Sequence, residues 1–140
     1  FTVYGPGQRP DMAFAKFVQR IRAGEPVELF GEGRLLRDYT FVDDVVEAIV
    51  AALERRMQPG QAAYRLYNVG GGSPTPLVDV VDLLGRLLEL TPTKRLVPRP
   101  ATDVPYTGAD IGRIRLELGW EPRTTLTEGL RRYIESLGAR

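Results

Sequence analysis

The 140-residue chain contains no cysteine and no histidine. Their absence excludes disulfide bonds, thiolate nucleophiles, Cys/His metal sites and histidine general bases. Lysine is also scarce, because Lys16 and Lys94 are the only two among 19 basic residues, which leaves 17 arginines. Arginine is suited to forked recognition of phosphate and carboxylate, although a coding bias is our preferred explanation for most of these residues. Any chemistry must use carboxylates, tyrosine, serine, threonine, lysine, arginine or a bound cofactor.

The chain also lacks long apolar runs and a strong net charge. No apolar run reaches the length needed to cross a membrane and no signal peptide is visible, so we expect no membrane partner and a cytoplasmic location. The net charge of +1 and the dispersed arginines argue against a nucleic-acid binder, which normally carries a basic patch. The length and the 43% hydrophobic content are typical of one globular domain.

Hydrophobic periodicity predicts an α/β chain in which helices are separated by short strands. We expect a helix over residues 10–24, with Pro10 in its first turn. A second helix is expected to begin at Asp43 and Asp44, since acidic side chains favour a helix N-terminus. The stripe that should be buried on this second helix consists of Val46, Ile49, Val50 and Leu53.

Capping residues predict three further helices. Thr75 should cap one, with Pro76 at its first position, and Asp110 should cap a short one that Gly119 closes. Residues 125–128 form a capping box, Thr-Leu-Thr-Glu, at the start of the last helix. Strands are expected at residues 1–4, 27–30, 35–42, 66–69 and 95–97, and a loop at 58–61.

The glycine run Gly70-Gly71-Gly72 lies between a predicted strand and a predicted helix, where a phosphate-binding loop is often found. The pattern G-x-G-x-x-G fails here, because its third glycine would fall at Thr75, and no G-K-[ST] follows. We therefore interpret the run as a strand-to-helix turn, and the chain has no dinucleotide-binding fingerprint of its own.

Two Arg/Asp pairs are candidates for anion binding. Arg37 is followed by Asp38, and Arg99 is followed by Asp103 in a proline-containing loop. A carboxylate beside an arginine can orient the guanidinium toward a phosphate, but a surface ion pair explains the first pattern equally well. Two such arginines on separate loops could straddle a diphosphate, although residue spacing alone does not show that they meet.

Five segments of the chain together resemble one enzyme family. The segments are FTVYGPGQRPDMAF, VELFGEGRLLRDYTFVDDVVEA, LYNVGGGSPTPL, RPATDVPYTGADI and LGWEPRTTLTEGL. They are similar to the C-terminal part of extended short-chain dehydrogenase/reductases, the NAD-dependent nucleotide-sugar epimerases and dehydratases. The resemblance covers essentially the whole chain in family order. The stretch YGPGQRPDMAF is most similar to that of UDP-glucuronate 4-epimerases.

The resemblance implies an α/β fold made of a small mixed substrate-binding region plus the last strand and helices of a Rossmann-type domain. Residues 1–140 would form one substrate-binding region and would be a fragment, because the family's glycine-rich NAD loop and Tyr-x-x-x-Lys pair lie upstream of the strand that matches residues 1–4. NAD would then be bound mainly by that upstream part. We expect the chain alone to be catalytically inactive and to self-associate through apolar faces that the Rossmann part normally covers.

The resemblance also implies contacts to the sugar and the base. Thr2 matches a sugar-contacting position, and Thr2 together with Arg9 would hold a hexuronate carboxylate. Phe30 matches a residue near the uracil. The alternatives are an ordinary β-branched strand residue for Thr2, a solvated loop charge for Arg9 and a core aromatic for Phe30.

Contacts to the diphosphate and the ribose are implied at the two Arg/Asp pairs. Arg37 matches a phosphate-binding arginine, oriented by Asp38, and Arg99 matches a second diphosphate arginine. Asp103 matches a residue near the ribose, in a loop that is one residue longer than the R-P-G-D of many relatives.

The resemblance implies that the chain binds a UDP-sugar, and we expect this to be a UDP-hexuronate. The enzyme of which it would be part is an NAD-dependent epimerase that acts at C4 through a 4-keto intermediate. Two alternatives stay open. One is another nucleotide-sugar dehydratase or decarboxylase of the same family. The other is a non-catalytic module that binds nucleotide sugars without chemistry.

Overall fold

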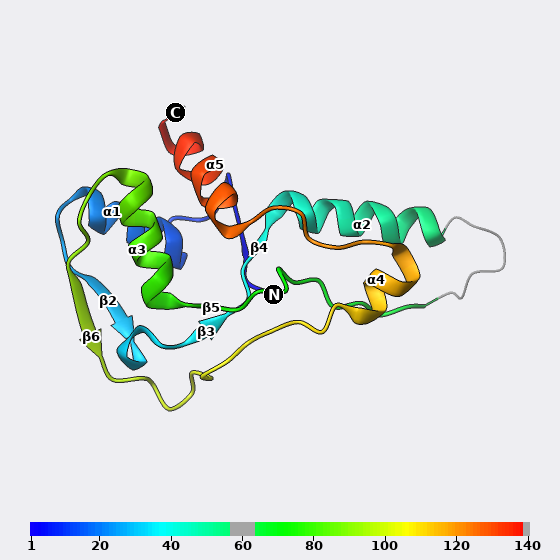
Figure 1. The fold of residues 1–140 in the computed structure, drawn as a ribbon, viewed down its shortest axis with the longest axis horizontal. Helices are drawn as coiled ribbons and strands as arrows, with labels where there is room; N and C mark the ends of the chain where they lie inside the picture. Colours follow the sequence, from blue (N-terminus) through cyan, green and yellow to red (C-terminus); the bar gives the residue numbers. More distant parts are fainter. Residues whose placement is uncertain (57–63, 139–140) are drawn as a thin grey trace.

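The structure, a computed structural model, describes residues 1–56 and 64–138. The loop expected at 58–61 lies outside the described residues. Helices and short strands alternate along the chain (Figure 1). The elements are β1 (Val3–Tyr4), α1 (Ala13–Arg22), β2 (Val27–Phe30), the 3-10 turn η1 (Gly31–Gly33), β3 (Leu36–Arg37), β4 (Thr40–Phe41), α2 (Val42–Arg56), β5 (Thr75–Pro76), α3 (Leu77–Leu88), β6 (Lys94–Val97), α4 (Gly112–Leu118) and α5 (Leu126–Gly138).

The described strands form three separate two-stranded pairs. β1 pairs with β4 and β2 pairs with β6, both in parallel, whereas β3 and β5 are antiparallel. The longest ladder is β2–β6, which runs from Val27 opposite Lys94 to Phe30 opposite Val97. Parallel strands need long connections, and here the connection from β2 to β6 includes α2 and α3.

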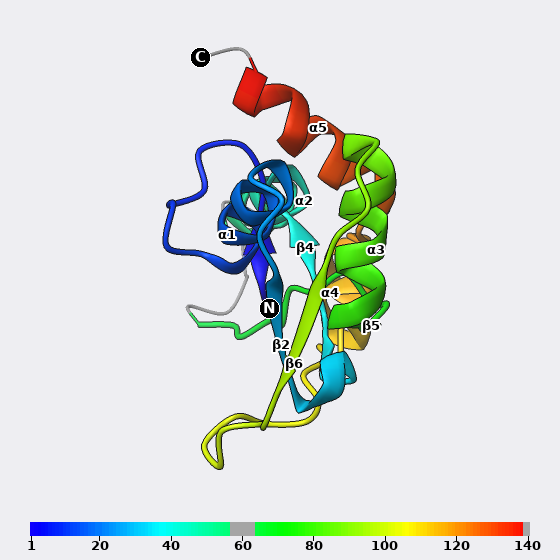
Figure 2. The ribbon, with the colours of Figure 1, turned by 90° about the vertical axis from the view of Figure 1, so that its left-hand side faces the viewer.

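The main hydrophobic core lies between α1, α3, α5 and the first two strand pairs. Figure 2 shows α1 and α3 on either side of the β2–β6 ladder, with α5 beside α3. Tyr4 packs edge-to-face against Phe14 and Phe41, at ring-centroid distances of 5.1 and 5.5 Å. The fully buried members of this core include Phe14, Val18, Val27, Leu29, Val80, Val81, Leu84 and Leu130.

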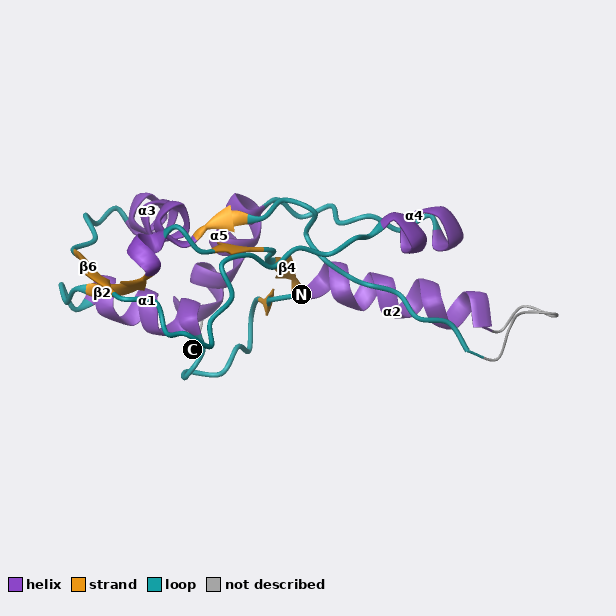
Figure 3. Ribbon diagram, turned by 90° about the horizontal axis from the view of Figure 1, so that it is seen from below, coloured by secondary structure: helices purple, strands orange, loops and turns teal. Residues whose placement is uncertain are grey.

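A second, smaller core joins α2 to α4, and the two helices extend away from the α1–α3 body (Figure 3). Its buried residues are Ala48, Ile111, Ile114 and Trp120. Asp44, which is buried near the start of α2, links this part to α5, because its carboxylate accepts hydrogen bonds from the backbone N–H of Arg123 and Thr124, at 3.3 and 3.1 Å. None of the described helices is long and apolar enough to cross a membrane.

Most helix predictions are confirmed. α1 buries Phe14, Phe17, Val18 and Ile21, as its periodicity predicts. Gly119 ends α4 in a left-handed conformation with φ of 64°, as predicted. The predicted cap of this helix is shifted by one residue, because Ile111 occupies the N-cap position and the carboxylate of Asp110 instead accepts a hydrogen bond from the N–H of Gly112 at 2.9 Å in the turn before it. Thr125 caps α5 by accepting a hydrogen bond from the N–H of Glu128 at 3.2 Å.

Two further predicted helix starts are shifted. α1 begins at Ala13 rather than at Pro10, because residues before it form a turn closed by the N–H of Met12 and the carbonyl of Arg9. Thr75 lies in β5 and donates its hydroxyl to the carbonyl of Ser73, so Pro76 occupies the N-cap position of α3. Pairing with β3 therefore takes the residue that could otherwise cap the helix.

One strand prediction is wrong in part, and another is wholly wrong. Residues 35–42 form β3 and β4 instead of one strand, because β3 pairs with β5 while β4 pairs with β1. Residues 66–69 form no strand, since no described strand runs beside them. The carbonyl of Val69 instead accepts a hydrogen bond from the amino terminus of Phe1 at 2.8 Å.

The prediction that the α2 stripe is buried is also wrong. The four residues are between 47% and 61% exposed in the described structure, and they are Val46, Ile49, Val50 and Leu53. Periodicity shows only that these side chains share one face. The opposite face, which carries the buried Ala48, is the one that packs against α4 and its neighbours.

Candidate functional site

A cavity of about 600 Å³ opens between α1, β2 and β3. Its walls carry both apolar and charged side chains from segments that are far apart in the sequence. The lining residues that carry the argument are Thr2, Lys16, Phe30, Arg37, Tyr39 and Asp103. Four of the seven predicted site residues are therefore brought together here.

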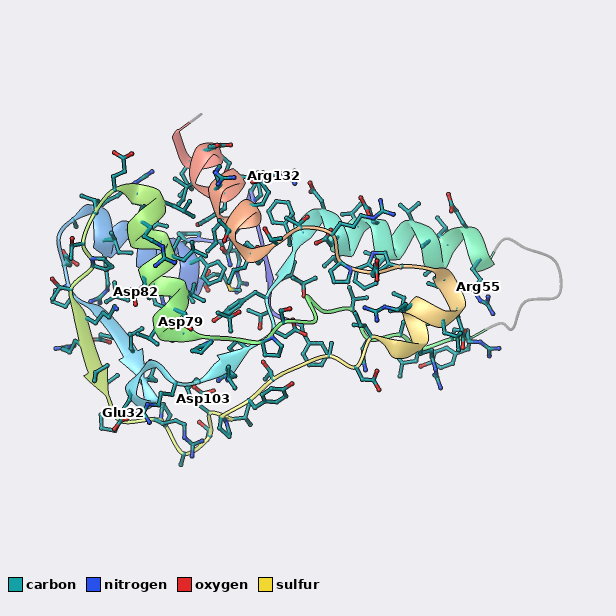
Figure 4. All side chains as sticks on the ribbon, viewed as in Figure 1. Glu32, Arg55, Asp79, Asp82, Asp103 and Arg132 are labelled. Carbon is teal, nitrogen blue, oxygen red and sulfur yellow. The ribbon has the colours of Figure 1, made fainter. Side chains whose placement is uncertain are left out.

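Arg37 and Asp103 form the centre of this site. The Nη2 of Arg37 lies 2.5 Å from Oδ1 of Asp103, and its Nη1 donates to the carbonyl of Leu36 at 2.9 Å. The loop that carries Asp103 is fixed beside β3, because Leu36 and Tyr106 form an isolated parallel bridge. Figure 4 shows Asp103 on this loop, next to β3. The ion pair is half-buried and lines the cavity, so it is part of the wall rather than a surface contact.

Asp38 does not take the orienting role that was predicted for it. Its carboxylate is fully buried and accepts a hydrogen bond from the N–H of Ala109 at 3.0 Å. Successive side chains of an extended segment point to opposite sides, so Arg37 faces the cavity while Asp38 faces the other way. The carboxylate that holds Arg37 comes instead from Asp103, 66 residues along the chain.

Arg99 lies outside the cavity, in an adjoining hollow of about 480 Å³ that Glu32 also lines. Its Nη1 donates a hydrogen bond to the backbone carbonyl of Asp103. The two predicted diphosphate arginines therefore meet at one residue: Arg37 contacts the side chain of Asp103 and Arg99 contacts its backbone. Both guanidinium groups are thus held by contacts with Asp103, and their joint binding of a diphosphate stays a prediction.

Thr2 and Phe30 line the cavity, whereas Arg9 does not. Phe30 is 39% exposed at the end of β2, so it is not an ordinary core aromatic. Arg9 is largely exposed and forms an ion pair with Asp11 at 3.2 Å. Asp11 itself is a lining residue, which places Arg9 next to the edge of the cavity.

Several lining residues were missed by the sequence analysis. Ala13, Lys16 and Arg20 all lie on α1 and all face the cavity. Their spacing of three and four residues is that of one helix face, which could have identified them together. Tyr39, which was assigned only to a motif, is a buried wall residue whose hydroxyl has no hydrogen-bond partner among the described groups.

The phenol of Tyr39 is kept neutral by its surroundings. Burial raises its pKa to about 12, and the positive charge of the nearby Arg37 offsets part of this effect. Its ring packs against Phe14 at a centroid distance of 5.0 Å. Tyr39 therefore contributes an apolar surface, rather than an ionisable group, to this wall at neutral pH.

The glycine run does not fit a dinucleotide. A Cβ at Gly70 would lie 2.6 Å from Oδ2 of Asp38, and one at Gly71 would collide with the carbonyl oxygen of Tyr39. These glycines are required because the backbone passes directly over residues 38 and 39, which leaves no room for a side chain. The packing of Gly70 and Gly71 against residues 38 and 39 therefore agrees with the interpretation of the run as a structural turn.

Comparison with known proteins places the chain in a family. Residues 1–70 match the NAD dependent epimerase/dehydratase family. UDP-glucuronate 4-epimerase 4 from Arabidopsis thaliana is 38% identical over 96% of this chain and 33% of its own length.

Solved structures share the fold. The structure of UDP-glucuronic acid 4-epimerase from Bacillus cereus, in complex with UDP-glucuronic acid and NAD, superposes with a TM-score of 0.89 and 30% identity over 99% of this chain and 43% of that protein. UDP-glucose 4-epimerase from Thermotoga maritima, solved with UDP-glucose, gives a TM-score of 0.83 and 32% identity over 99% of this chain and 44% of that protein.

The fold is therefore the C-terminal portion of an extended Rossmann-type short-chain dehydrogenase/reductase. The chain belongs to the NAD dependent epimerase/dehydratase family. It spans less than half the length of the relatives that it matches.

Proposed function

We propose that residues 1–140 are the substrate-binding region of a UDP-glucuronate 4-epimerase that uses NAD. The observation that carries this proposal is the cavity, which gathers Thr2, Phe30, Arg37 and Asp103 on a fold that superposes over 99% of the chain with an enzyme solved in complex with UDP-glucuronic acid. NAD would supply the oxidation and reduction at C4 when bound by other parts of the enzyme. The chain itself would bind and orient the sugar nucleotide.

The ion pair of Arg37 prepares it to bind a phosphate. A guanidinium has five N–H donors, and the contacts with Leu36 and Asp103 use two of them. The remaining donors can bind phosphate oxygens without a change of rotamer, because the carboxylate already fixes the plane of the group. Arg99, four residues before Asp103 in the same loop, donates to the backbone carbonyl of Asp103. Asp103 would keep the arginine in place and accept a hydrogen bond from a ribose hydroxyl.

The other wall residues would hold the two ends of the substrate. Phe30 offers a half-exposed ring that can stack on the uracil. Thr2 and Arg9 would bind the hexuronate carboxylate, the first from inside the cavity and the second from its edge. Holding the carboxylate matters because oxidation at C4 creates a β-keto acid, which can lose carbon dioxide. Binding energy from the remote nucleotide would position the sugar ring for reaction.

A test is calorimetric titration of the chain with UDP. We expect Arg37→Gln to weaken UDP binding roughly tenfold or more, because a charge-assisted hydrogen bond to phosphate is lost. The matched control is Arg34→Gln, since Arg34 is an exposed arginine that pairs with Glu32 and does not line the cavity. Equal affinities of the Arg37 and Arg34 variants would contradict the assignment of the diphosphate site.

A non-catalytic nucleotide-sugar-binding module is the second candidate. The cavity supports it as well, because the residues that it brings together can bind and orient a ligand without a catalytic group. Both candidates bind UDP. They differ in whether the protein that carries this chain converts UDP-glucuronate to its C4 epimer, which a product assay by chromatography would detect.

A further inference from the structure

Asp38 is a fully buried carboxylate to which the proposed function gives no role. Its Oδ2 accepts a hydrogen bond from the N–H of Ala109, whereas its Oδ1 has no partner among the described groups. Burying a carboxylate with so few hydrogen bonds costs stability. The glycine run also encloses it closely, because a Cβ at Gly70 would lie 2.6 Å from Oδ2. The contact that only a polar side chain can make at this position is the hydrogen bond with Ala109.

Three hydrogen bonds tie the loop after β6 to β3 and to the residue that follows β3. The N–H of Leu36 donates to the carbonyl of Pro105, and the N–H of Thr107 donates to the carbonyl of Leu36, both at 3.0 Å. If this parallel ladder continued, the N–H of Ala109 would donate to the backbone carbonyl of Asp38. It donates instead to the carboxylate of Asp38, also at 3.0 Å. The side chain of Asp38 therefore supplies the third bond of the series.

These three bonds lie close to both members of the ion pair between Arg37 and Asp103. Arg37 stands between Leu36 and Asp38, which both bond to the loop. Asp103 lies two residues before Pro105, where the first of the three bonds is made. The register of the loop on β3 therefore determines where the carboxylate of Asp103 meets the guanidinium of Arg37.

We propose that Asp38 is a positioning residue for the diphosphate, because its carboxylate holds the loop in the register that places Asp103 against Arg37. This inference rests on the proposed function, since it concerns the same phosphate-binding arginine. Asp38 acts through its hydrogen bond with Ala109 and not through an ion pair with the guanidinium, which pairs with Asp103.

The first test is titration of UDP into folded variants by calorimetry. Asp38→Ala removes the acceptor of the Ala109 N–H, and we expect it to weaken UDP binding roughly three- to tenfold. Asp38→Asn keeps an oxygen acceptor at the same place, so it should bind UDP within about twofold of the unaltered chain.

A double-mutant cycle shows whether Asp38 acts through Arg37. In the Arg37→Gln background, the guanidinium that the loop positions is already gone. Asp38→Ala should then change the affinity for UDP by less than about twofold. A substitution that only weakened the fold would lower the affinity by the same factor in both backgrounds.

Asp44→Ala is the matched control. Asp44 is also a buried carboxylate that accepts a backbone N–H, but it is not among the residues that line the cavity. Each variant is titrated at a temperature at which circular dichroism shows it to be folded. Asp44→Ala should then bind UDP as tightly as the unaltered chain, which separates positioning of the site from loss of stability.

Amide hydrogen exchange tests the same link without a substitution. Coupling between two sites is reciprocal, so UDP bound at Arg37 should hold the loop more firmly on β3. We expect UDP to slow exchange of the Ala109 N–H roughly threefold or more. The N–H of Thr124, which donates to Asp44, is the internal control and should exchange at an unchanged rate. This measurement decides the inference even if Asp38→Ala does not fold.

Each contrary outcome has a definite meaning. Full UDP affinity in folded Asp38→Ala, or an equal loss in both backgrounds, would overturn the inference and leave the proposed function in place. A loss in Asp38→Asn as large as that in Asp38→Ala would also overturn it, as would exchange at Ala109 that UDP does not change. An unaltered chain that does not bind UDP would contradict the proposed function itself.

Discussion

Arg37 and Asp38 are neighbours in the sequence but serve different parts of the molecule. Arg37 faces the cavity and pairs with Asp103, whereas Asp38 is buried on the other side and accepts a hydrogen bond from Ala109. The next residue, Tyr39, has its backbone under the glycine run and its ring in the cavity wall. These three consecutive residues therefore connect the wall of the cavity to the buried segments that pack on its other side, at Ala109 and at the glycine run.

Tyr39 gives a prediction for alkaline pH. Its pKa of about 12 in the folded chain lies above the ordinary value of 10.0 because the phenol is buried, so only the unfolded chain loses this proton between pH 10 and 12. The contribution to stability is therefore complete below pH 10 and is lost as the pH rises to 12, at about 1.4 kcal/mol per pH unit.

The measurement is urea unfolding at a series of pH values. Tyr39→Phe should flatten the loss of stability above pH 10. At pH 7 it should change the free energy of unfolding by less than about 1 kcal/mol, since the deleted hydroxyl has no partner among the described groups. Burial also raises the pKa of Tyr4 and Tyr133, so part of the alkaline slope should persist in the variant. An unchanged slope would show that Tyr39 ionises normally.

At the scale of elements, Asp44 ties the start of α2 to the segment that leads into α5. Its carboxylate accepts hydrogen bonds from two backbone N–H groups and from the hydroxyl of Thr124, while its carbonyl accepts one from the indole of Trp120 at 3.1 Å. The sequence pattern indicated a helix N-terminus for Asp43 and Asp44 alike. The structure gives them different roles, because only Asp44 is buried.

Replacing Asp44 should destabilise the fold. Asp44→Ala leaves the N–H groups of Arg123 and Thr124 without their acceptor in a buried setting, so we expect a loss of about 2–4 kcal/mol in the free energy of unfolding. Asp43→Ala is the matched control on the same helical turn. It removes an exposed ion pair with Arg132 and should cost less than about 1 kcal/mol. Chemical denaturation measures both, and equal losses would contradict the role of Asp44.

At the scale of the whole molecule, the exposed α2 stripe is the largest departure from what the periodicity predicted. Its four residues lie at i, i+3, i+4 and i+7 on one face, and they are Val46, Ile49, Val50 and Leu53. Val3 lies in β1, which contacts α2, and Phe1 lies just before this strand. Both side chains are also more than 40% exposed. Contiguous apolar surface of this kind promotes association in water.

We therefore expect the chain to self-associate, with a mass that rises with concentration. Light scattering coupled to size exclusion measures this directly. Ile49→Glu places a charge in the middle of the stripe and should shift the mass toward that of a monomer. Leu116→Glu is the matched control, because Leu116 is a single exposed apolar residue on α4 outside the stripe. A constant monomer mass for the unaltered chain would contradict the prediction.

Local features of the sequence were sufficient to predict most helices. The period of apolar residues identifies α1 and its buried face, and the cap at Thr125 depends on a hydrogen bond that spans three residues. The motifs were sufficient to identify the family and to name six residues as candidate substrate contacts. The structure brings four of the six, Thr2, Phe30, Arg37 and Asp103, into one cavity. Their roles in binding stay predictions.

What only the tertiary structure decided depends on partners distant in the chain. It determined that Asp103 rather than Asp38 pairs with Arg37, that Gly71 packs against Tyr39, and that the apolar stripe of α2 is exposed. The sequence by itself determined which residues share a helix face, because that follows from a local period of 3.6 residues. Which face is covered, and which carboxylate reaches an arginine, is set by contacts between segments that only the folded chain brings together.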